Sequence, residues 1–232
     1  MKAYKQFYEN YAKNYPDDLV IRTSQLLIIK KLVHYKNKIG LDVGTANGAF
    51  ALELAKDGAK KVYGIDIAKR FIENARKKAR KLKINNVEFK QADARELPFK
   101  DEIFDFVICT EVLEHVPNFK KAIYEIKRVL KPNGEFLITV PNSLNPAEIL
   151  HQLKHLAFYL LRGEPFTHIN LFFFFTFSKH FSWAREKQLL PLHFVLPFFS
   201  KKYINQSLIQ LDIILGNLLK PFSFDIVLNG KK

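Results

Sequence analysis

The chain has 232 residues and a formal net charge of +14, a length that suits one domain with a substantial core, and no linker rich in Pro, Gly or Ser divides it. Its single cysteine, Cys109, excludes a disulfide framework and a cysteine-based zinc site. No apolar stretch is long enough for a signal peptide or a membrane span, so we expect a soluble, cytoplasmic protein that at most touches a membrane surface.

Two leading helices are predicted over Tyr4–Tyr15 and Leu19–Tyr35. Between Ile39 and Val140, short apolar runs alternate with helical patterns, which is typical of a parallel sheet with crossover helices. The expected strands are Ile39–Val43, Lys61–Ile65, Val87–Gln91, Phe104–Cys109 and Glu135–Val140, and the expected helices are Ala49–Lys56, Lys69–Leu82 and Phe119–Leu130. A turn at Lys131-Pro132-Asn133-Gly134 should end the last of these helices.

Much of the positive charge lies in Lys69–Lys83, where Phe71, Ala75, Ala79 and Leu82 recur at helical spacing. The basic residues between these apolar positions would face water. We therefore interpret the segment as a solvated helix face, and a patch that binds nucleic acid is the alternative.

The pattern becomes less regular after Pro141. An aromatic run occupies His168–Phe177. The other elements predicted in this part of the chain are helices over Pro146–Leu161, Ser178–Leu190 and Tyr203–Leu219, and strands over Leu192–Phe199 and Phe222–Leu228.

Residues Ile39–Phe50 place an apolar strand, an acid and a glycine-bearing turn directly before a helix. Gly44 and Gly48 can adopt positive φ and let a ligand approach the main chain, and the helix that follows offers unpaired N–H groups. Asp66 ends the next apolar run, at the spacing where nucleotide-binding folds place a carboxylate for ribose hydroxyls. By itself this turn fits a dinucleotide site, a nucleoside site or a plain tight turn.

Further landmarks occur in a fixed order along the chain. They are Asp42-Val43-Gly44-Thr45-Ala46-Asn47-Gly48, Gly64-Ile65-Asp66-Ile67, Gln91-Ala92-Asp93-Ala94, Phe104-Asp105-Phe106-Val107, Glu111-Val112-Leu113-Glu114-His115-Val116 and Leu130-Lys131-Pro132-Asn133-Gly134-Glu135. Together they resemble the class I S-adenosylmethionine-dependent methyltransferases, in the type 11 branch that includes enzymes of quinone biosynthesis. The aromatic leader at Phe7–Tyr15 is similar to that of the same branch.

The resemblance implies a Rossmann-like α/β fold. We expect a mostly parallel, seven-stranded sheet with helices on both faces, an antiparallel last strand, and a helical, aromatic insertion after the fifth strand. A single domain over residues 1–232 would comprise leading helices (1–36), a cofactor-binding core (37–142), a substrate-side insertion or lid (143–190) and a closing β-α-β unit (191–232).

The resemblance also implies a site for S-adenosyl-L-methionine at the carboxyl ends of the strands. Asp42 would face the methionine ammonium, Asp66 would accept hydrogen bonds from ribose, and Asp93 with the Ala94 N–H would bind adenine. The other cofactor-binding residues that it implies are Gly44, Thr45, Ala46, Ile67, Thr110 and Glu111.

One position departs from the family pattern. The turn usually reads Gly-x-Gly-x-Gly, and Ala46 replaces the middle glycine. Binding should survive if Ala46 has negative φ. The same departure argues against a nicotinamide-dependent enzyme, whose pattern requires glycine there.

Glu111, Glu114 and His115 are spaced to share one face of a helical turn. In quinone-ring O-methyltransferases and small-RNA 2′-O-methyltransferases, a similar Glu-x-x-Glu-His helps to bind a divalent metal. We expect polar lining without a metal here. Metal binding by the three side chains and general-base catalysis by His115, the candidate catalytic residue, are the alternatives.

A sulfonium methyl group is already activated, so positioning of the acceptor dominates the chemistry. We expect the residues that choose the acceptor in the leading helices and in the stretch Ser143–Leu190. We expect a small apolar or ring-bearing acceptor, because aromatic residues crowd positions 158–183; the same residues equally suit the core of a lid or a dimer contact. Lys154, Arg162 and Lys179 flank them and would allow contact with an anionic membrane surface. The competing hypotheses are an RNA or tRNA methyltransferase recruited by the basic surface and a non-catalytic cofactor-binding or scaffolding protein.

Overall fold

The computed structural model describes residues 2–13, 20–146, 148–150, 152–153, 169–192, 223 and 225–232. Its strands are β1 (Ile39–Val43), β2 (Lys61–Asp66), β3 (Val87–Gln91), β4 (Phe104–Thr110), β5 (Leu130–Pro141), β6 (Arg185–Leu192) and β7 (Asp225–Lys231). Its helices are α1 (Lys2–Tyr11), α2 (Val20–Leu32), α3 (Ala49–Lys56), α4 (Lys69–Lys81), α5 (Phe119–Val129) and α7 (Phe174–Phe177), with 3-10 turns η1 (Leu113–His115) and η2 (Ser178–Phe181).

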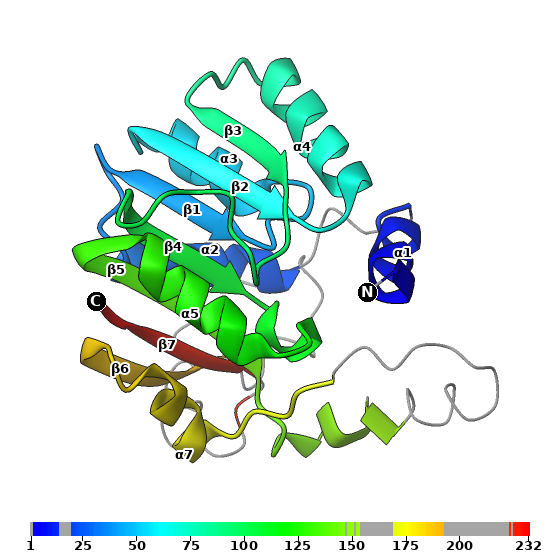
Figure 1. Ribbon diagram of the computed structural model, residues 1–232, viewed down its shortest axis with the longest axis vertical. Helices are drawn as coiled ribbons and strands as arrows, with labels where there is room; N and C mark the ends of the chain where they lie inside the picture. Colours follow the sequence, from blue (N-terminus) through cyan, green and yellow to red (C-terminus); the bar gives the residue numbers. More distant parts are fainter. Residues whose placement is uncertain are drawn as a thin grey trace.

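The strands form one sheet in the order β3-β2-β1-β4-β5-β7-β6 (Figure 1). The first five strands pair in parallel, and β7 is antiparallel to both β5 and β6. The predicted mostly parallel, seven-stranded sheet with an antiparallel last strand is therefore confirmed.

Both faces of the sheet are covered, as expected when crossover helices connect parallel strands. Ile29 of α2 lies in one apolar cluster with residues of α3 and α4 and with Ile108 of β4. On the other face, Ile126 of α5 lies in a second cluster with Cys109. Adjacent residues of β4 thus point to opposite faces, which buries this central strand on both sides.

Two predicted elements differ from the structure near the sheet. The predicted turn at Lys131-Pro132-Asn133-Gly134 lies inside β5, where the pairing register shifts and Asn133 takes a φ of 60°. The predicted helix over Ser178–Leu190 is wrong: η2 ends at Phe181, and β6 then pairs with β7. The helix-forming residues of this segment become a strand because edge pairing overrides local propensity.

The aromatic run after residue 168 contributes mainly to the core. Phe172, Phe174, Phe177 and Phe181 are buried against α5 and β5, on the face opposite α3. The side chain of Phe175 remains exposed. The four buried phenylalanines therefore belong to the core. Phe158, Tyr159 and Phe166 lie outside the described residues.

The predicted helix over Tyr203–Leu219 and nearly all of the predicted strand Leu192–Phe199 also lie outside the described residues. Within the described part of the chain, no helix has both the length and the apolar character needed to cross a bilayer.

Candidate functional site

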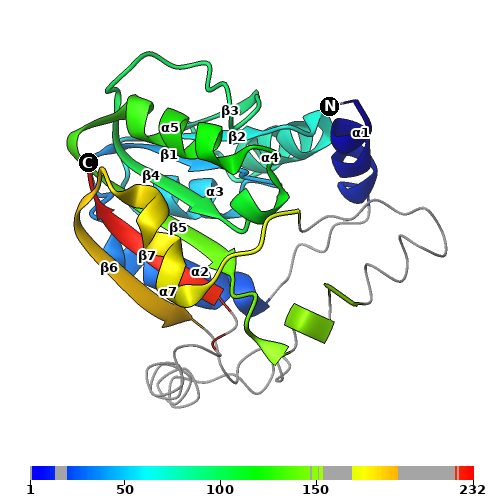
Figure 2. The same cartoon turned by 60° about the horizontal axis from the view of Figure 1, so that its bottom comes forward.

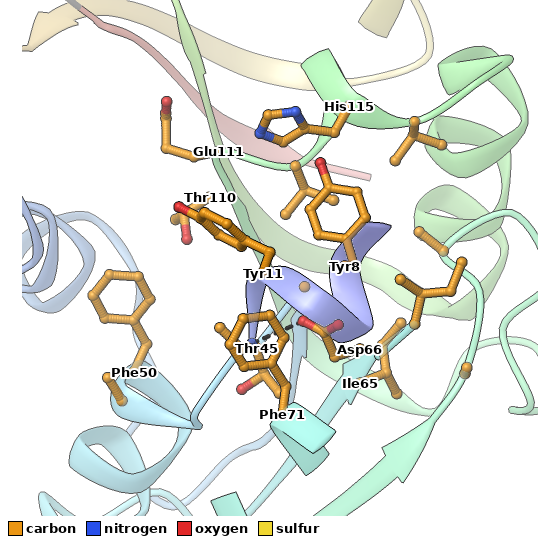
Figure 3. A pocket seen from close by; sticks show the side chains of 18 of the residues that line it. Tyr8, Tyr11, Thr45, Phe50, Ile65, Asp66, Phe71, Thr110, Glu111 and His115 are labelled. Atoms are coloured by element: carbon orange, nitrogen blue, oxygen red, sulfur yellow. Dashed lines mark hydrogen bonds between the residues drawn. The ribbon is translucent and has the colours of Figure 1, made fainter. Parts of the chain in front are cut away.

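A cavity of about 300 Å³ opens at the carboxyl ends of β1, β2 and β4 (Figure 3). Open α/β sheets bind ligands at this edge. Most of the residues predicted for the site line this cavity, namely Gly44, Thr45, Ala46, Asp66, Ile67, Asp93, Ala94, Thr110, Glu111 and His115. Asp42 lies behind the wall, where its buried carboxylate accepts a 2.6 Å hydrogen bond from the Thr45 hydroxyl.

Asp66 is held by main-chain N–H groups at the end of β2. The Ala46 N–H donates to one carboxylate oxygen at 3.0 Å, and the Ala68 N–H donates to the other at 2.9 Å. Burial raises the pKa of Asp66 to about 6, although these N–H groups favour the ionised form. The carboxylate is therefore rigidly placed at the cavity wall, where vicinal hydroxyl groups could donate to it.

The turn after β1 has the backbone conformation that its glycines predict. Gly44 has a φ of 73° and Gly48 a φ of 80°. A Cβ on Gly44 would lie 2.2 Å from Val112 Cγ2, so the glycine is also required by close packing. Ala46 has a φ of 45°, so the condition of negative φ set for this position is not met, and the residue is held in the left-handed region.

Asp93 follows β3 and is held by Arg95. The guanidinium Nη2 lies 2.6 Å from Asp93 Oδ2, and Nε lies 3.0 Å from Oδ1. Burial alone would raise the pKa of Asp93, but the paired Arg95 outweighs it and the pKa is lowered. An ionised carboxylate therefore marks this end of the cavity.

Glu111, Glu114 and His115 do not share a helical face, which corrects the expectation from their spacing. Glu111 directly follows β4, has a φ of 53° and accepts a 2.7 Å hydrogen bond from the Thr139 hydroxyl, whereas Glu114 and His115 lie in η1. No group of three or more Asp, Glu, His or Cys residues in the described segments is arranged to hold a metal ion.

Glu114 lies behind the cavity, with 1% of its surface exposed. Burial first, and then the nearby Glu111 carboxylate, raise the pKa of Glu114 well above its usual range. His115 Nε2 lies 3.5 Å from Glu114 Oε1, and the imidazole also lines the cavity. The imidazole of His115 is therefore one titratable ring at the cavity wall, and it lies beside the carboxyl group of Glu114, whose own ionisation is disfavoured.

Several lining residues were missed by sequence reasoning. They are Tyr8, Tyr11, Gln25, Phe50, Phe71 and Asp225. The sequence places acceptor-choosing residues in the leading helices, where Tyr8, Tyr11 and Gln25 lie, but no spacing there identifies these individual side chains. The remaining residues lie on elements far apart in the sequence, so no local motif contains them.

Helix α1 is attached above the cavity through Glu9. The carboxylate accepts hydrogen bonds from the Lys69 N–H at 2.6 Å and the Arg70 N–H at 3.2 Å, at the first turn of α4. An acid at a helix N-terminus is favoured by the exposed N–H groups and the helix dipole. The Tyr8 ring then lies edge-on to His115, with 5.8 Å between ring centroids (Figure 3).

A family model described as a methyltransferase domain matches residues 34–189. An uncharacterized protein of Methanocaldococcus jannaschii is 37% identical over 167 residues, which are 66% of this chain and 68% of that protein. The ubiquinone/menaquinone biosynthesis C-methyltransferase UbiE of Rickettsia massiliae is 40% identical over 103 residues, 42% of each chain. The ubiquinone biosynthesis O-methyltransferase of Alkalilimnicola ehrlichii is 36% identical over 151 residues, 65% of this chain and 60% of that protein.

Solved structures share the fold. One is a SAM-dependent methyltransferase, possible histamine N-methyltransferase, of Thermotoga maritima, with a TM-score of 0.69, 19% identity, and 100% of this chain and 99% of that chain covered. Another is phosphoethanolamine N-methyltransferase 2 of Haemonchus contortus in complex with S-adenosyl-L-methionine, with a TM-score of 0.65, 16% identity, and 91% of this chain and 52% of that chain covered. At these identities the likeness concerns the fold alone.

Proposed function

Because this chain belongs to the class I S-adenosylmethionine-dependent methyltransferases, as its ordered motifs predicted, we propose that it methylates a small, ring-bearing acceptor held beneath α1. One observation carries this proposal. The rings of Tyr8 and Tyr11, on α1, and of Phe50, on α3, line the same cavity as Asp66. Such a wall favours a flat, partly apolar ligand over a nucleic acid strand.

We divide the cavity into two ends. The donor end comprises the turn after β1 together with Asp66, Asp93 and their neighbours, which would hold the methionine, ribose and adenine parts of the methyl donor. The donor supplies an activated methyl group when bound. At this end the protein mainly binds and orients.

The acceptor end comprises Tyr8, Tyr11 and His115. We assign the two tyrosines to stacking against the acceptor and to the exclusion of water. His115 is the residue that we propose as a proton acceptor, because its imidazole lies at the wall beside Tyr8.

The proposal is tested by incubating the purified chain with methyl-labelled donor and a fractionated extract of the source cell. We expect label in a ring-bearing small metabolite, with transfer that is insensitive to ribonuclease. Label in RNA, with transfer that falls steeply as salt rises, would replace the proposal by an RNA methyltransferase. Donor binding without label in any fraction would favour the non-catalytic alternative.

A further inference from the structure

The side-chain amide of Gln25, on α2, is buried in the cavity wall without a partner. Only 4% of Gln25 is exposed, and its Nε2 has no hydrogen-bond partner in the described structure. Burial of an unpaired amide is costly, and native structures pair nearly all such groups. Because Gln25 also lines the cavity, a bound ligand could supply the missing hydrogen-bond partner of its amide.

The position of α2 shows which part of a ligand Gln25 can reach. Ile29 of α2 lies in an apolar cluster with Leu137 of β5 and Val227 of β7, and both Figure 1 and Figure 2 draw α2 close to β4 and β5 and far from β3. Asp93 follows β3, at the opposite edge of the sheet. Gln25 therefore enters the cavity on the side away from the adenine-binding residues.

The first turn of α3 adds N–H groups at the same wall. Ala49 and Phe50 line the cavity, and no side chain caps the helix at Gly48. The first N–H groups of a helix lack intrahelical partners and favour a negative charge. The N-terminus of α4 differs, because Glu9 already occupies it.

The charges of the wall restrict the kind of ligand group that fits beside Gln25. Among the lining residues that the structure describes, none is Lys or Arg, although the whole chain carries a net charge of +14. Glu111 and Asp225 suit an ammonium group. A carboxylate would have to be bound by neutral donors, and the Gln25 amide with the α3 N-terminus provides them.

We propose that Gln25 Nε2 and the first turn of α3 bind the α-carboxylate of the methionine part of the methyl donor. The amide donates a hydrogen bond to a carboxylate oxygen, while the acidic side chains nearby face the ammonium. The inference does not depend on which acceptor is methylated.

The test compares three ligands by isothermal titration with the full chain near neutral pH. S-adenosylhomocysteine has both the ammonium and the carboxylate, decarboxylated S-adenosylmethionine keeps only the amine, and 5′-methylthioadenosine lacks both groups. Gln25→Leu should lower the affinity for S-adenosylhomocysteine about 10- to 100-fold and change the affinities for the other two ligands less than about twofold. Gln25→Glu should weaken S-adenosylhomocysteine further, because it places like charges together.

Gln188→Ala is the matched control, because Gln188 is an exposed glutamine on β6. It should leave all three affinities unchanged. Thermal unfolding without ligand gives an independent readout: Gln25→Leu should raise the melting temperature by about 2–4 °C, because it removes a buried, unpaired amide.

Three results would overturn the inference. Equal losses for all three ligands, together with a lower melting temperature, would make Gln25 a structural residue. Unchanged affinity for S-adenosylhomocysteine would exclude contact with the donor carboxylate. An increased KM for the acceptor with unchanged donor affinity would assign the amide to an anionic group of the acceptor.

Discussion

The two ends of the cavity are built in different ways. At the donor end, Asp66 and the turn after β1 lie at neighbouring strand ends of one sheet, and main-chain N–H groups fix the carboxylate. At the acceptor end, the wall combines α1 and η1, which meet through the side chains of Tyr8 and His115. Recognition of the donor's ribose thus depends on the strand ends of the sheet, whereas acceptor recognition depends on elements added around it.

The largest effect is expected from a substitution that impairs ligand binding at the donor end alone. Asp66→Ala should lower the affinity for S-adenosylhomocysteine about 300-fold, because two charge-assisted hydrogen bonds of about 1.5–2 kcal/mol each are lost. Isothermal titration measures the change, and Asp101→Ala, which removes an exposed carboxylate, is the control. A loss below about threefold in a folded Asp66→Ala protein would contradict the assignment of ribose to Asp66.

The next effect is confined to the acceptor end. His115→Ala should lower kcat about 100-fold and leave the Kd for S-adenosylhomocysteine unchanged, because a general base acts on the acceptor. The matched control is His34→Ala, since His34 is an exposed histidine paired with Glu135. A parallel loss of donor affinity would show instead that His115 supports the donor end.

The pH dependence of binding sharpens the comparison. The pKa of Asp66 lies at about 6, so its carboxylate is ionised above this pH and gains a proton below it. Affinity for S-adenosylhomocysteine should therefore be constant above about pH 7 and fall up to tenfold per pH unit below about pH 6. Titration of Asp66→Asn should show no such fall, and a flat wild-type profile would refute the role of this ionisation.

A smaller effect concerns the attachment of α1. Glu9→Ala removes the carboxylate that accepts hydrogen bonds from two N–H groups at the start of α4. Loss of this cap costs about 1 kcal/mol, so α1 should detach about fivefold more often. We expect stopped-flow measurements to show donor release accelerated by about the same factor. Glu73→Ala, which removes a carboxylate that pairs with Lys69, should leave release unchanged. Equal release rates in wild type and Glu9→Ala would mean that α1 does not gate the donor.

The smallest effect tests strain at the donor end. Ala46→Gly should stabilise the protein by about 1 kcal/mol, because glycine accepts the left-handed conformation without a Cβ penalty. This corresponds to an increase of about 2–4 °C in melting temperature. Ala55→Gly, inside α3, should lower the melting temperature instead. A lower melting temperature for Ala46→Gly would argue against strain at this turn.

The same contrast explains what the sequence could predict. Asp66 ends β2, and Asp93 and Glu111 come shortly after β3 and β4. Alternation of apolar runs identifies all three strands, so convergence of these acids at one sheet edge was predictable. Tyr8, Gln25 and Asp225 reach the cavity only through tertiary packing. No spacing within a single segment specifies such contacts.

Composition left two interpretations of the aromatic segment open. A run such as Phe172–Phe175 suits both a ligand wall and a core, and burial decides between them. Its buried members lie under α5, while the rings at the cavity come from α1, α3 and α4. The prediction of a helix over Ser178–Leu190 failed for a related reason, because the partner strand β7 lies more than thirty residues away in the chain.

The contact between Gly44 and Val112 has a consequence for the order of events in catalysis. The Val112 side chain fills the space that a Cβ on Gly44 would occupy, and Val112 precedes His115 by three residues. Close-packed groups leave little room for independent movement, so a shift of the turn displaces the segment that carries the imidazole. We therefore expect synergy between the two substrates, in which occupancy by the first tightens the site for the second.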